Sequence, residues 1–534
     1  MYKFFKNNKQ LGDVCVAKQG MATSDNNTFV RAWTEIDSTK LGLNYQDRES
    51  AKKSNKKWFP YNKGGFYRKW YGNNDYVVNW ENDGISIRNY EGSVVRNPDY
   101  YFKEGLTWTF IAINFGIRYV PVGFLFDVAG STVFARKDLI KYIAGYLCSK
   151  IANNFMYLLN PTMNFQTSNV ETLPIIFPSN DDTVMTIENL VNKNIEISKD
   201  DWDSFETSWD FKIHPLLRFS NFGKGLVDYK NINESEPITL DGFKIKCCFE
   251  KWKKYKQEQF NKLKANEEEL NKLFIEIYGL QDEMTPDVAD KDITISLADE
   301  KREIKSLLSY AVGCMLGRYS LDEEGLAFAG GTFDKFKYNK LEVDEDGILP
   351  ILSDTWFEDD IIEELKRFLK ASFGDICLSE NMEYIADVLG RKSGESAEST
   401  IRNYFLKDFY KDHVQVYKKR PIYWMFTSGK EKAFNCLVYL HRYDKTTISR
   451  IRKDYLHEFQ AKLDRAIAQA EDEGNVKLTS LYAKYKKELQ DYDSKIKDFA
   501  DAQIELDLDD GVKVNYAKFK GLLEAEKDIV GKEK

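Results

Sequence analysis

The spacing of apolar residues changes near residue 135 of this chain of 534 residues. Before that point, short runs of β-branched and aromatic residues alternate with turns rich in Gly, Asn, Asp and Pro, whereas afterwards apolar residues recur at helical spacing. A β-rich segment followed by long helices predicts an α+β fold. The expected strands are TFVRAW (28–33), DYVVNW (75–80), SVVR (93–96), TFIAI (109–113), YVPVGFLF (119–126) and STVFA (131–135).

The rest of the chain is expected to be mostly helical, and Gly474-Asn475 predicts the hinge of a long helical hairpin. One strand pair, VQVYKK (414–419) with IYWMF (422–426), interrupts the helices. The expected helices are 137–159, 244–278, one from ITISL (293–297) to Tyr319, 359–373, 447–472 and 476–502. The expected regions are a β-rich domain (1–180), a connector with a long helix (181–280), a mixed α/β domain (281–440) and a helical arm and tail (441–534).

Charge divides along the chain in a similar way. Residues 1–150 contain 22 Lys and Arg against 14 Asp and Glu, a net charge of +8. The remaining residues contain 55 basic against 71 acidic side chains, so their net charge of −16 makes the chain −8 overall. A basic module joined to an acidic remainder suggests a polyanionic partner for the basic part, and cations interleaved with rings around 52–71 favour nucleic acid.

Seven cations of this part are candidates for phosphate contacts, and five polar residues in turns are candidates for base reading. The alternative for the cations is a solvated basic surface, and for the asparagines it is turn formation. The phosphate candidates are Lys52, Lys53, Lys56, Lys57, Lys63, Arg68 and Lys69. The base-reading candidates are Asn73, Asn74, Asn26, Asn27 and Arg31.

Several classes of site lack sequence support. The chain contains no GxGxxG, GxxxxGK[ST] or GxSxG motif, and its seven scattered cysteines form no CxxC pair. We therefore expect no metal site and a reducing compartment. The start MYKFFKNNKQLGDV lacks a signal-peptide core, and Arg118, Pro121 and Asp127 interrupt the most apolar stretch. These features predict a cytoplasmic protein without a membrane partner.

One short pattern is compatible with a Mg²⁺-dependent nuclease. Asp287, Asp299 and Lys301 flank the apolar run ITISL, and acidic groups with a lysine can bind Mg²⁺ and activate water. The competing interpretation is helix initiation, with Ser296 as the cap and Asp299 and Glu300 in the first turn.

The order of several segments resembles the C-terminal half of the large adenine-specific DNA methyltransferases of the BREX phage-defence system, the PglX family. The matching segments are LGDVCVAKQGMATSDNNTFVRAWTEI (11–36), FYRKWYGNNDYVVNWENDG (66–84), RNPDYYFKEGLTWTF (96–110), PVGFLFDVAGSTVFA (121–135), YIAGYLCSKIANNFMYLLNPTMNFQTSNVETLPI (142–175), YGLQDEMTPDVADKDITI (278–295), LLSYAVGCMLGRYSLDEEGL (307–326) and RPIYWMFTSGKEKAF (420–434).

The resemblance implies that the β-rich first domain recognises the target sequence in double-stranded DNA. The family's catalytic domain, with its S-adenosylmethionine loop and Asn-Pro-Pro-Tyr motif, has no counterpart here. We therefore expect no catalytic residue and no cofactor in this chain. The implied partners are double-stranded DNA, a methyltransferase catalytic domain or subunit that binds S-adenosylmethionine, and other BREX components. The alternative function is a non-catalytic scaffold subunit of a defence complex, and the mixed charges of the helical arm favour protein contacts for that region.

Overall fold

A computed structural model describes residues 2–221 and 239–531 of the chain. The chain folds into two compact units, each of which is assembled from separate stretches of sequence. Unit 1 comprises Met1–Trp33, Lys40–Ser208 and Lys254–Leu297, and unit 2 comprises Thr34–Thr39, Trp209–Lys253 and Ala298–Lys534. The boundaries of these two units differ from those of the four regions expected from the sequence.

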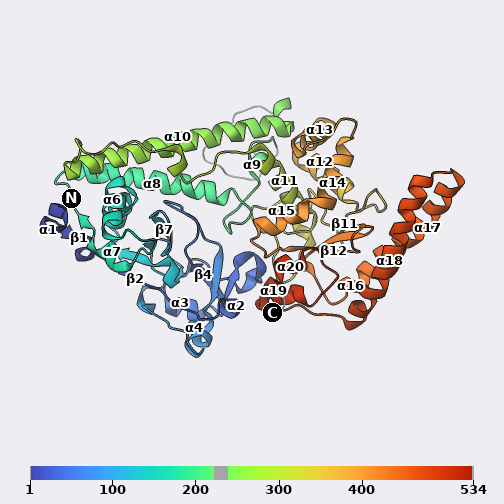
Figure 1. Cartoon of the computed structure of the whole chain (residues 1–534), viewed down its shortest axis with the longest axis horizontal. Coiled ribbons are helices and arrows are strands. Elements are labelled where there is room, and N and C mark those ends of the chain that lie inside the picture. The colour runs from blue at the N-terminus through green and yellow to red at the C-terminus, as the bar shows by residue number, and fades with distance from the viewer. Residues whose placement is uncertain (1, 222–238, 532–534) are drawn as a thin grey trace. The chain divides into compact units, whose positions relative to one another are not determined.

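Unit 1 combines short strands with helices, of which α8 and α10 are the longest (Figure 1). Its strands are β1 (Lys9–Gln10), β2 (Cys15–Lys18), β3 (Val30–Ala32), β4 (Trp58–Asn62), β5 (Tyr76–Asn79), β6 (Gly105–Thr107), β7 (Arg118–Val120), β8 (Leu125–Phe126), β9 (Thr132–Ala135) and β10 (Pro174–Ile175). Its helices are α1 (Tyr2–Asn7), α2 (Asn26–Phe29), α3 (Arg48–Lys53), α4 (Glu81–Arg88), α5 (Ile140–Cys148), α6 (Lys150–Leu159), α7 (Thr167–Thr172), α8 (Asp181–Asp203) and most of α10 (Ile245–Tyr278).

Unit 1 has two four-stranded sheets, of strand orders β2-β9-β6-β7 and β3-β5-β4-β8, and a two-stranded sheet of β1 and β10. Strands β4 and β8 pair in parallel, with Tyr61 opposite Leu125, and the other neighbours are antiparallel. The first sheet shares a hydrophobic core with α5, α6, α8 and α10. Gly145 lets α5 approach α8 closely, because a Cβ there would lie 3.0 Å from both Ile187 and Val191.

Unit 2 is mainly helical around a small sheet of order β11-β13-β12. Its long helices α17 and α18 pack against each other as an antiparallel hairpin (Figure 1). Its strands are β11 (Ile348–Pro350), β12 (Tyr423–Thr427) and β13 (Asn435–Tyr439). Its helices are α9 (Pro215–Arg218), α11 (Glu300–Met315), α12 (Ile361–Phe373), α13 (Leu378–Leu389), α14 (Ala397–Lys407), α15 (Phe409–Val416), α16 (Thr447–Arg450), a π-helical stretch (Ile451–Leu456), α17 (His457–Asp472), α18 (Val476–Ala502), α19 (Gly511–Ala517) and α20 (Glu526–Ile529).

The α+β class and the C-terminal hairpin are confirmed. Four of the expected segments differ in the structure. VQVYKK is not a strand, because 409–416 form helix α15. The helix expected at 137–159 is two helices, since Ser149 has an extended backbone and its side chain caps α6. The runs at 93–96 and 109–113 form only isolated bridges, through Val94 and Ile111.

No helix among residues 2–221 and 239–531 is both long enough and apolar enough to cross a membrane.

Candidate nucleic-acid interface

Lys52 and Lys53 are exposed in the last turn of α3, where the partial negative charge of the helix end favours cations. The start of α3 is fixed, because Asp47 caps it and Arg48 donates to Asp83 through Nε at 2.8 Å. Lys56 and Lys57 follow in the loop before β4 and are half-buried. These cations lie on the surface of unit 1, where phosphate groups could reach the ammonium groups of Lys52 and Lys53.

Arg68 and Lys69 face the interior of unit 1 instead. Arg68 Nη2 lies 2.6 Å from Asp201 of α8, and Lys69 forms a buried ion pair with Glu267 of α10. Burial alone would raise the pKa of Asp201, but the charges of Lys256 and Arg68 outweigh burial and hold that pKa below its usual value. Both cations therefore join helices to the sheet region, and the structure gives them a packing role.

Three of the base-reading candidates are also buried. Asn73 has a left-handed backbone with a φ of +63°, and its amide donates to the carbonyl of Phe66 at 2.9 Å. Asn74 is its buried neighbour in the segment before β5, so neither amide is presented to solvent. Arg31 packs over the ring of Trp58 and donates to the carbonyl of Asn27, which places it beneath α2.

Asn26 and Asn27 are exposed in the turn that begins α2. Asp25 caps this turn by accepting from the backbone N–H groups of Asn27 and Thr28 at 2.9 and 3.2 Å. The hydrogen bond from the Thr28 hydroxyl to Asp25 holds the pKa of that carboxyl below its usual value. Lys63 donates to the side-chain oxygen of Asn26 at 2.6 Å. The structure thus joins two predicted site residues, Lys63 and Asn26, that are far apart in the sequence.

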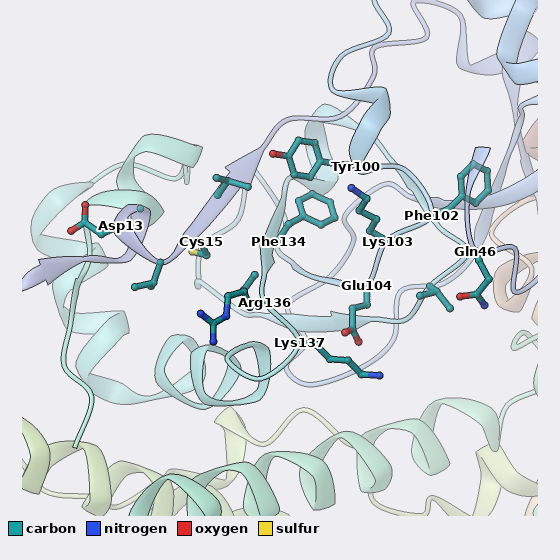
Figure 2. A pocket seen from close by; sticks show the side chains of 15 residues that line it. Asp13, Cys15, Gln46, Tyr100, Phe102, Lys103, Glu104, Phe134, Arg136 and Lys137 are labelled. Atoms are coloured by element: carbon teal, nitrogen blue, oxygen red, sulfur yellow. The ribbon is translucent and has the colours of Figure 1, made fainter. Parts of the chain in front are cut away.

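A hollow of about 600 Å³ lies elsewhere on unit 1, between β2, β9 and the segment around Tyr100 (Figure 2). Its apolar side includes Phe102 and Phe134, and the Phe134 ring lies 4.9 Å from the Tyr100 ring. Figure 2 shows the basic side chains of Lys103, Arg136 and Lys137 around the same hollow, together with the acidic side chains of Asp13 and Glu104.

Sequence reasoning missed this hollow. Its cations come from two loops, with Lys103 in one and Arg136 and Lys137 in the other, so no basic run marks them. The signal that could have been used is the pair Arg136-Lys137 directly after the strand 131–135. Basic side chains beside aromatic rings are compatible with contacts to a nucleic-acid backbone.

The three residues of the nuclease pattern are divided between the two units. Asp287 lies in unit 1, whereas Asp299 and Lys301 lie in unit 2. Asp299 caps α11 by accepting from the backbone N–H of Arg302 at 2.8 Å, which supports helix initiation. The predicted cap is wrong, however, because Ser296 bonds to Asp201 instead. Within the described residues, no three His, Cys, Asp or Glu side chains gather in a way that could hold a metal ion.

No family model matches the chain. Its sequence is similar to two curated adenine-specific methyltransferases. One, named PglX, comes from Lacticaseibacillus casei (strain Zhang) and is 40% identical over 532 residues, which cover 95% of this chain and 42% of the relative. The other, named BrxX, comes from Escherichia coli O9:H4 (strain HS) and is 38% identical over 558 residues, which cover 96% of this chain and 43% of the relative. The chain therefore spans less than half the length of these curated relatives.

Proposed function

We propose that this chain recognises double-stranded DNA for an adenine-specific methyltransferase of a phage-defence system. In this proposal unit 1 contacts the DNA, and a separate catalytic domain binds S-adenosylmethionine and methylates the exocyclic amine of adenine. Similarity along nearly the whole chain to two longer proteins named as adenine-specific methyltransferases is the observation that carries the proposal.

The surface of unit 1 supports a DNA-binding role in two ways. Lys52 and Lys53 present exposed charges in the part of the sequence with a net charge of +8. Asn26 and Asn27 present side-chain amides, which can form hydrogen bonds with base edges. Phosphate contacts would position the chain on the duplex and base contacts would supply its sequence preference. The proposed surface excludes Arg68, Lys69, Asn73, Asn74 and Arg31, because they are engaged inside unit 1 or buried there.

A salt titration of duplex binding tests this proposal. The affinity of the full chain should fall steeply with salt concentration, because each neutralised phosphate releases counterions. Charge reversal by Lys52→Glu and Lys53→Glu should weaken binding to all sequences. The salt slope, which is the slope of log affinity against log salt concentration, should become shallower by roughly one for each phosphate that these lysines no longer neutralise.

The matched control reverses two exposed lysines of α18, Lys484→Glu and Lys487→Glu, with the same change in net charge. If both double variants bind duplex DNA equally well, the α3 cations do not contact phosphate. If the unchanged chain binds no duplex at any salt concentration, the proposed function fails as a whole. Adenine methylation by the purified chain alone would contradict the proposed division between recognition and catalysis.

A further inference from the structure

The side chain of Asn26 is held in one orientation by two donors. Lys63 Nζ lies 2.6 Å from Asn26 Oδ1, and the buried hydroxyl of Thr23 donates to the same oxygen at 3.0 Å. A lysine ammonium has only donors, so the atom facing Lys63 must be the amide oxygen and not the nitrogen. This contact fixes which end of the Asn26 amide faces the protein.

Lys63 is itself held from the interior of unit 1. Its ammonium lies 3.5 Å from Asp127 Oδ2, and the same carboxylate accepts from the buried Tyr61 hydroxyl at 2.8 Å. The backbone N–H of Ala129 donates to the other oxygen of Asp127 at 2.8 Å. Lys63 is therefore oriented by a partly buried network and, in turn, orients Asn26.

The two lone pairs of Asn26 Oδ1 are thus occupied, whereas its nitrogen Nδ2 carries two N–H donors. Within the described part of the chain, no acceptor for Nδ2 is found, and the Asn26 side chain is exposed. The outward face of this residue consequently presents donors alone.

We infer that Asn26 is a specificity-determining residue that reads a guanine or thymine edge, with Lys63 as its positioning residue. The inference rests on the proposed function and deepens it. In the major groove guanine offers N7 and O6 and thymine offers O4 as acceptors, which match the free donors of Asn26. The usual bidentate pairing of asparagine with adenine needs the side-chain oxygen as an acceptor, and that oxygen is already occupied. Adenine places its N6 donor beside its N7 acceptor, and cytosine offers only a donor. One donor of Asn26 would therefore face another donor at either base, so Asn26 selects against both at its position.

The inference gives Lys63 a role different from a phosphate contact. A phosphate contact would affect all DNA sequences equally, and its removal would lower the salt slope by roughly one. A positioning residue would instead change the base preference at one position and leave the salt slope unchanged. The conservative change Lys63→Arg keeps a donor toward Asn26 and should keep the preference.

Selection of bound duplexes from a randomised DNA library, followed by sequencing, tests the inference on the full chain. The unchanged chain should show one position that prefers guanine or thymine on the order of tenfold over adenine or cytosine. Asn26→Asp replaces the outward donors by an acceptor, so the preference at this position should switch to adenine or cytosine. Lys63→Met should weaken the preference at that position without changing the salt slope. Asn89→Asp provides the control, because it makes the same substitution at another exposed asparagine of unit 1.

Four outcomes decide between the ideas. A switch in Asn26→Asp but not in Asn89→Asp supports the inference. Specific binding with the same preferred sequence in both variants overturns the inference and leaves the proposed function standing. A lower salt slope in Lys63→Met, with the base preference retained, assigns Lys63 to a phosphate and also overturns it. Absence of duplex binding by the unchanged chain overturns both.

Circular dichroism of each variant establishes that unit 1 remains folded, and Thr23→Val offers a second, uncharged way to release Oδ1.

Discussion

At the scale of single residues, the candidate cations differ in what surrounds them and not in their residue type. Lys53 and Lys69 are both lysines of the basic segment, yet one is exposed and the other pairs with Glu267 inside unit 1. Glu267 lies almost two hundred residues away along the chain, so no local pattern could reveal this pair. The sequence therefore predicted the basic character of the segment but not which of its cations face solvent.

Asp344 of unit 2 allows a prediction of pH dependence. Burial, together with the nearby carboxylates of Asp346 and Asp359, raises the pKa of Asp344 to about 7. Because this pKa exceeds that of an unfolded aspartate, the folded state takes up a proton. The resulting stabilisation is complete below about pH 4 and is lost as the pH rises through about 7. In the unchanged chain, the backbone N–H of Gly347 donates to the Asp344 carboxylate at 2.6 Å. Asp344→Asn removes the negative charge but retains a side-chain oxygen that can accept this hydrogen bond.

We expect Asp344→Asn to increase the free energy of unfolding by about 1–3 kcal/mol at pH 8 and by much less at pH 5. Chemical denaturation of variant and unchanged chain at both pH values measures this difference. Asp472→Asn, at an exposed position of α17, controls for the change in net charge. An equal effect of Asp344→Asn at the two pH values would show that Asp344 is already ionised in the folded state at pH 5.

At the scale of elements, the helices with a long apolar stripe were predicted best. The expected helix at 244–278 agrees with α10 because Leu263, Leu270 and Phe274 recur at helical spacing and are buried. The strand prediction for VQVYKK was wrong because six residues are too few to distinguish the two-residue period of a strand from the 3.6-residue period of a helix. In α15, Phe409, Tyr410, His413 and Val414 form one buried helical face that begins before the window. The parallel pairing of β4 with β8 joins residues more than sixty positions apart, which local patterns do not encode.

The hinge of the C-terminal hairpin gives a second prediction. Gly474 has a φ of +67°, and Asn475 caps α18 by accepting from the N–H of Leu478 at 3.1 Å. A Cβ at Gly474 would contact nothing within 4 Å, so a side chain there meets only backbone strain. Gly474→Ala should lower the free energy of unfolding by about 1 kcal/mol, and Gly474→Asn by less, because asparagine tolerates this conformation better. Urea denaturation compares the two variants, and equal losses would exclude backbone strain as the cause.

At the scale of the whole molecule, each unit depends on stretches of chain that lie far apart in the sequence. The region 1–180, expected to be a domain, contains only part of unit 1. It lacks α8, which packs on α5, and it lacks Phe274 of α10, whose ring lies 5.5 Å from that of Tyr142. It also lacks Asp201 and Glu267, the partners of Arg68 and Lys69. In such a fragment, Arg68 and Lys69 would lose their ion-pair partners, and the apolar face that α8 and α10 cover would be exposed to solvent.

We therefore expect the fragment 1–180 to lack a cooperative unfolding transition, because the apolar face that α8 and α10 cover in the full chain would be exposed to water. A second fragment, 1–208 joined by a flexible linker to 254–297, restores α8, Asp201 and Glu267 and should unfold cooperatively. Thermal unfolding followed by circular dichroism, with amide hydrogen exchange, compares both fragments with the full chain. Cooperative unfolding of 1–180 with strong exchange protection would mean that its sheets form a core without α8 and α10. In that case the sequence-based boundary near residue 180 would describe the folding unit better than the packing of α8 and α10 does.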